Sequence, residues 1–178
     1  MASKGQEGRV PLPNDDPAVF ALYFQWVYRG RIFSSQDTGD TGGNREEISL
    51  LVDAYVFGEK LQDRDFRDAV IDSLIHAVDT PDAQDLKWYP TSAAIDSAYI
   101  GTPEGWPLRK LLVDMHFFHG LPKWVNEESN VEFLRDLARK FLQDRSDFFT
   151  RTDQTTVKLA GYSYHCHGAE NTCYNGSQ

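Results

Sequence analysis

The chain has 178 residues, which is enough for one domain of ordinary size with its own apolar core. Apolar residues make up 40% of it and charged residues 25%, a balance typical of folded rather than disordered chains. The 27 acidic and 18 basic side chains give a formal net charge of -9, so the phosphate backbone of a nucleic acid would be repelled on average. We therefore expect a folded protein that does not bind nucleic acid.

The sequence also argues against a membrane partner. No run approaches the roughly 18 apolar residues that a membrane-spanning helix requires, and the opening stretch MASKGQEGRVPLPNDDP lacks the apolar core of a secretory signal. Two cysteines, Cys166 and Cys173, are too few for a disulfide framework, so the core has to hold without one. We expect an intracellular protein, cytoplasmic or nuclear.

The first helical pattern starts at Pro17. Asn14, Asp15 or Asp16 can cap the helix, Pro17 suits its first turn, and Gly30 should end it. Apolar and aromatic residues recur at steps of three and four, which predicts an amphipathic helix with a heavily aromatic buried stripe. The members of this stripe are Val19, Phe20, Tyr23, Trp26 and Val27.

The rest of the chain predicts a mainly α fold, a helical bundle of about six helices, because alternating strands of any length are not visible. Residues 45–61 are apolar nearly all round, so this helix should be central. Ile32 and Phe33 are expected to form either a short strand or a docked extended turn. The remaining helices are expected from Asp63 or Asp65 to Thr80, around Ser92 to Tyr99, from Pro107 to His119 and from Val131 to Phe149.

Two stretches then bear on the class of protein. The first is LPNDDPAVFALYFQWVYRGRI, residues 12–32, and the second, after a variable loop, is LLVDAYVFGEKLQDRDFRDAVIDSLI, residues 50–75. The acidic helix start, the WVYRGRI ending, the LVDAYVFG segment and the later Phe66 and Ala69 together resemble the second half of a fungal BTB/POZ domain. Residues 99–149 and the Tyr-His-Cys-His tail are similar, more loosely, to the helices and Cys/His-bearing tail that often follow this domain.

The resemblance implies a non-catalytic adaptor that binds another protein and needs no cofactor. The partners that it suggests are a cullin, in a ubiquitin ligase assembly, or a second copy of the chain. It predicts four regions: a flexible lead 1–12, a partial BTB/POZ-like helical region 13–80, a trailing helical region 81–150 and an extended tail 151–178. The strands and helices that open a complete domain are not found before Leu12. Phe33-Ser34-Ser35-Gln36 stands where the family carries a hydrophobic-x-Glu cullin contact. A truncated gene product without independent function is therefore an alternative.

Partner binding is expected at the apolar helix faces that the missing half would cover. Unless later helices cover them, the open patch would exceed the roughly 300–600 Å² typical of monomers. Aromatic side chains supply most of the affinity in such interfaces. The residues expected to contact the partner are Phe20, Tyr23, Trp26, Leu51 and Tyr55.

The alternative hypothesis is a small zinc-binding domain that uses the C-terminal tail. His165, Cys166, His167 and Cys173 are zinc-ligand types, but adjacent ligands seldom all reach one ion and the usual paired spacings are missing. No metal site is therefore assigned. This leaves a solvated tail as the favoured interpretation.

Catalytic patterns are not found, so we expect no enzyme. The chain has no Gly-x-Ser-x-Gly elbow, and its glycines fit neither a phosphate loop nor a dinucleotide motif. His116 and His119, three apart on a helix, could share a metal, although packing at the helix end is the favoured interpretation. A site assembled from distant residues, with His116 beside carboxylates of another helix, is the third hypothesis.

Overall fold

The computed structural model describes residues 16–32, 43–144 and 161–166. Within these ranges the chain forms α-helices and two short 3-10 turns and has no strand, which confirms the mainly α fold. The helices are α1 (Pro17–Arg29), α2 (Gly43–Leu61), α3 (Arg64–Asp79), α4 (Ser92–Gly101), α5 (Pro107–His119) and α6 (Val131–Gln143); the turns are η1 (Pro122–Trp124) and η2 (Gly161–Tyr164).

Local chemistry sets the helix ends. Asp16, Asp63, Thr91 and Asn130 each precede a helix, and the side-chain oxygen of each accepts a hydrogen bond from a backbone N–H of the first turn. Gly30 ends α1 with a φ of 62°, a left-handed conformation that glycine adopts without steric cost. The limits predicted for α1, α3 and α5 are therefore confirmed. By contrast α6 ends at Gln143, and residues 145–149 of its predicted range lie outside the described residues.

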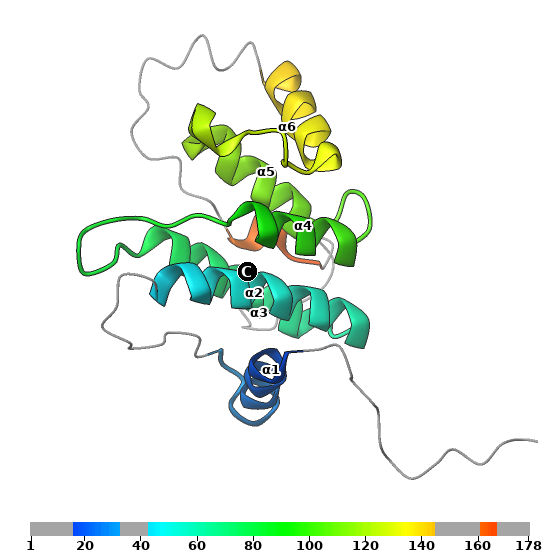
Figure 1. The fold of residues 1–178 in the computed structure, drawn as a ribbon. Helices are drawn as coiled ribbons and strands as arrows, with labels where there is room; N and C mark the ends of the chain where they lie inside the picture. The colour runs from blue at the N-terminus through cyan, green and yellow to red at the C-terminus, as the bar shows by residue number, and fades with distance from the viewer. Residues whose placement is uncertain (1–15, 33–42, 145–160, 167–178) are drawn as a thin grey trace, which may run out of the picture.

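The helices are arranged in layers around α2 and α3, which lie side by side (Figure 1). α1 packs on α2 from one side, and α4, α5 and α6 lie on the other side (Figure 1). One apolar core joins all of them, so the regions expected on either side of residue 80 share a single core. Its largest fully buried side chains include Ile48, Leu51, Tyr55, Phe57, Phe66, Ile71, Leu74, Leu108, Leu111, Leu112 and Met115.

Part of the tail belongs to this body. The turn η2 lies between the α2–α3 pair and α5 (Figure 1), and Tyr164 at its end is 6% exposed. The expectation of an extended, solvated tail is therefore wrong for residues 161–166. The rest of the tail lies outside the described residues.

None of the helices in the described ranges combines the length and the apolar character that crossing a bilayer requires.

The contact between α2 and α4 gives the first testable prediction. A methyl group added at Gly101 would overlap both methyl groups of Val56 on α2. Because Gly101 is the last residue of α4, alanine adds little helix stability there. We expect Gly101→Ala to lower the free energy of unfolding by about 1–3 kcal/mol, the usual cost of overpacking, measured by urea denaturation. Val56→Ala in the same chain should recover part of the loss; an unchanged single variant would contradict the packing described.

Candidate functional site

A continuous row of exposed apolar side chains follows the outer face of α1. We define this face as Phe20, Phe24, Val27 and Tyr28, which are 47%, 52%, 57% and 73% exposed. Steps of four, three and one residues place them on one side of the helix. No charged residue occurs between Pro17 and Tyr28, although a quarter of the whole chain is charged. The outer face of α1 is therefore both apolar and uncharged.

The opposite face of α1 anchors the helix to the core. Val19 and Leu22 are each 3% exposed. Tyr23 packs edge-on against the ring of Phe66, with 5.0 Å between centroids, and its hydroxyl donates to Asp63 over 3.2 Å. Burial, and then the charge of Asp63, raises the pKa of Tyr23, so the phenol stays protonated and donates this bond. The helix is thus held in one orientation and presents its outer face to solvent.

The exposed rings also contact one another. The Phe24 ring lies 4.4 Å from that of Tyr28 and 6.4 Å from that of Phe20, measured between centroids. Phe20 meets Phe57 of α2 edge-on at 6.5 Å. The row is therefore supported from beneath by the core, which restricts the rotamers that a binding event would have to order.

The structure corrects the predicted contact residues. Leu51 and Tyr55 are 0% exposed because α2 is covered by its neighbours, so they hold the core and present no surface to a partner. Tyr23 and Trp26 are partly buried against that core, and Phe20 is open. Phe20 and Val27 also depart from the expected buried stripe.

Sequence reasoning missed Phe24 and Tyr28. Their signal was present, because α1 is apolar on two faces and only one of them can lie against α2.

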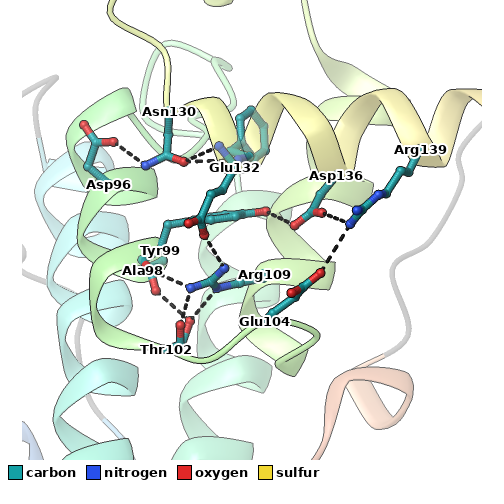
Figure 2. Close-up of polar contacts among 11 residues, drawn as sticks. Asp96, Ala98, Tyr99, Thr102, Glu104, Arg109, Asn130, Glu132, Asp136 and Arg139 are labelled. Atoms are coloured by element: carbon teal, nitrogen blue, oxygen red, sulfur yellow. Dashed lines mark hydrogen bonds and ion pairs between the residues drawn. The ribbon is translucent and has the colours of Figure 1, made fainter.

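A buried arginine organises the other end of the molecule (Figure 2). Arg109 of α5 is 6% exposed and donates to the carbonyl of Tyr99 over 2.6 Å, to both oxygens of Thr102 and to the carboxylate of Glu132 over 2.9 Å. Its guanidinium also lies 4.3 Å from the centroid of the Tyr99 ring. One side chain therefore ties the α4–α5 connection to the start of α6. The apolar pattern did not predict that Arg109 is buried, because the pattern assigns only its neighbour Leu108 to the core.

A groove of about 290 Å³ opens beside this network, and charged side chains of both signs line it. Arg109 pairs with Glu132, and Arg139 with Glu104 and Asp136. Since these charges are balanced inside the protein, we assign the groove a structural role. Its lining residues are Glu104, Arg109, Glu132, Arg135 and Asp136.

The two histidines of α5 are packed, as the favoured interpretation has it. Nδ1 of His116 lies 2.9 Å from the carbonyl oxygen of Leu112, and its ring meets Phe133 at 4.8 Å between centroids. His119 lies against the Tyr89 ring at 5.4 Å. Burial lowers the pKa of both imidazoles, because the charged form loses its hydration.

The described part of the Cys/His tail is engaged with other groups. His165 contacts Asp72, and the Cys166 sulfur lies 3.4 Å from the hydroxyl of Tyr55. Burial raises the pKa of the Cys166 thiol to about 11, so this thiol stays protonated at neutral pH. No cluster of three or more His, Cys, Asp or Glu side chains able to hold a metal occurs in the described ranges. His167 and Cys173 lie outside them.

No protein-family model, curated protein or solved structure matches the chain.

The first prediction from these sites concerns Arg109. Lysine keeps the charge but lacks the planar fork, so Arg109→Lys should leave a buried carbonyl of Tyr99 or Thr102 without a donor. We expect the free energy of unfolding to fall by roughly 1–3 kcal/mol. The matched control is Arg139→Lys, whose side chain is 54% exposed and which should change it by less than about 0.5 kcal/mol. Equal effects in urea denaturation would contradict the central role of Arg109.

The second prediction concerns His116. Because its pKa is lower in the folded state than its ordinary value near 6.5, the unfolded chain binds the proton more readily. Its contribution is complete above that value and is lost as the pH falls toward the folded pKa, at up to about 1.4 kcal/mol per pH unit. We expect His116→Gln to reduce the slope of unfolding free energy between pH 7.5 and about 5.5. Identical slopes for the two proteins would refute the assignment.

Proposed function

We propose that this chain is a protein–protein interaction module that acts by binding rather than by catalysis, and that the outer face of α1 is its contact surface. The observation that carries the proposal is the row formed by Phe20, Phe24, Val27 and Tyr28, which is exposed and free of charge. Buried aromatic side chains and depleted charge are the compositional marks of interface centres.

The energetics favour the same surface. Full burial of one phenylalanine side chain contributes about 1.5–3 kcal/mol relative to leaving it in water. Phe20 and Phe24 each have about half of their surface still to bury. The underlying core fixes α1, so little order has to be gained on binding. The exposed charged residues elsewhere offer no comparable gain, because surface ion pairs contribute little.

The class of module follows from the resemblance of residues 12–32 and 50–75 to the second half of a BTB/POZ domain. An adaptor is consistent with a face that binds without chemistry. Contact with a cullin, or with a second copy of the chain, and a place in the cytoplasm or nucleus are parts of this proposal that rest on the resemblance.

A paired measurement tests the contact surface. Phe24→Asp places a charge in the centre of the row and should sharply reduce the fluorescence of a hydrophobic dye added to the protein.

A photoreactive benzoylphenylalanine at position 24 should cross-link one defined protein in extracts of cells that express the chain. An adduct of twice the chain mass would identify a second copy. The double variant Phe20→Asp, Phe24→Asp should bind the cross-linked protein at least tenfold more weakly than the wild type, a difference of about 1.4 kcal/mol.

Ile100 supplies the matched control, because its side chain is 85% exposed and its helix, α4, lies on the opposite side of the α2–α3 pair from α1 (Figure 1). Ile100→Asp should leave dye binding unchanged, and the photoreactive residue at position 100 should give no adduct. Equal dye binding by wild type and Phe24→Asp, together with no adduct from position 24, would overturn the proposal.

A further inference from the structure

Residues 161–166 pack on the helical body and are held there by hydrogen bonds to α3 and α5. The segment sits between α3 and α5 (Figure 1), and sixteen residues lie between it and Asp144, the residue that follows α6. Its first four residues form η2, and Tyr164 is 6% exposed. The phenol of Tyr164 donates a 2.9 Å hydrogen bond to Asp114, a residue of α5 that is itself 5% exposed.

The next two residues bind carboxylates of α3. Nε2 of His165 lies 2.9 Å from Oδ1 of Asp72, and this histidine side chain is 2% exposed. The backbone N–H of Cys166 donates to Asp68 over 2.6 Å, and Asp68 is fully buried. Three consecutive residues thus engage three carboxylates of two helices.

The segment also lies close to α3 at its first residue. A side chain at Gly161 would overlap the carboxylate of Asp72, so that carboxylate would have to move away. Lys140 lies 3.2 Å from Asp114, and Lys110 stands over the Tyr164 ring at 5.4 Å, so the tyrosine pocket has cations on its rim. The residues that make these contacts are Gly161, Tyr164 and His165, which form the pattern Gly-x-x-Tyr-His.

We propose that Asp68, Asp72 and Asp114 line a peptide-binding groove that the chain occupies with its own residues 161–166. When this segment is displaced, the groove binds a segment of a partner protein with the same Gly-x-x-Tyr-His pattern. The groove is distinct from the outer face of α1, so the proposal does not depend on the function assigned to that face.

Asp68 and Asp114 are buried, at 0% and 5% exposed, whereas the Asp72 side chain is 33% exposed. The two buried carboxylates explain why the groove needs an occupant. A carboxylate removed from water is costly unless it accepts hydrogen bonds, so an empty groove would have to admit water or another donor. A tethered segment competes at an effective concentration in the millimolar range, which masks the groove from weaker ligands. Weakening the chain's own segment should therefore expose the groove to a peptide in solution.

The test uses the full chain and a fluorescent peptide with the sequence of residues 159–168, in which serine replaces cysteine. Fluorescence anisotropy measures its affinity for the wild type and for a Tyr164→Ala, His165→Ala double variant. We expect the double variant to bind the peptide at least tenfold more tightly than the wild type. Ser163→Ala is the matched control, because Ser163 is exposed in the same turn, and should behave as the wild type does.

Three further chains make the result decisive. Tyr164→Phe keeps the ring packed and removes only the hydroxyl, so it should fold as the wild type does and still bind the peptide more tightly. Asp114→Asn added to the double variant should reduce peptide binding at least tenfold. Phe24→Asp should bind the peptide as the wild type does, which separates this groove from α1. The proposal would be overturned if Tyr164→Phe and the folded double variant both bound the peptide no more tightly than the wild type does.

Discussion

The structure depends on one constraint, which is that more than half of the circumference of α2 has to be covered. Its side chains at Val52, Ala54 and Phe57 face different directions, and none is more than 2% exposed. No single helix can cover such a cylinder, because two packed helices share only one stripe each. α1, α3 and α4 each take one side of α2, and Cys166 of the C-terminal segment reaches the hydroxyl of Tyr55.

That constraint accounts for only one of the two apolar faces of α1. Helix α1 lies against α2 through Val19 and Leu22, and this contact uses only one side of a helix that is apolar on two. An ordinary surface helix would carry charged residues on the other side. In α1 that side carries Phe24 and Tyr28 instead, which are 52% and 73% exposed. The proposed binding function would account for this composition.

Much of the helical architecture could be predicted because its signals are local. Asp16, Asp63 and Gly30 act on the turns they adjoin, and the all-round apolar pattern of residues 45–61 indicated a central helix. The orientation of α1 could not be predicted, because periodicity does not say which of two apolar faces meets the core. The contacts of the tail were equally inaccessible: Tyr164 meets Asp114 across 50 positions and Cys166 meets Tyr55 across 111, and a single sequence carries no signal for such pairs.

The two proposed binding sites differ in their physical basis, and this difference bears on how they could act together. The outer face of α1 gains affinity from apolar burial, which is little affected by salt, whereas the groove of Asp68, Asp72 and Asp114 relies on hydrogen bonds to carboxylates. They lie on opposite sides of the α2–α3 pair (Figure 1), so one occupant does not block the other. Tyr55 lies between them. It belongs to α2, against which α1 packs, and its hydroxyl lies 3.4 Å from the sulfur of Cys166. Under the two proposals, release of the segment would leave α1 in place and open a second, more polar contact surface.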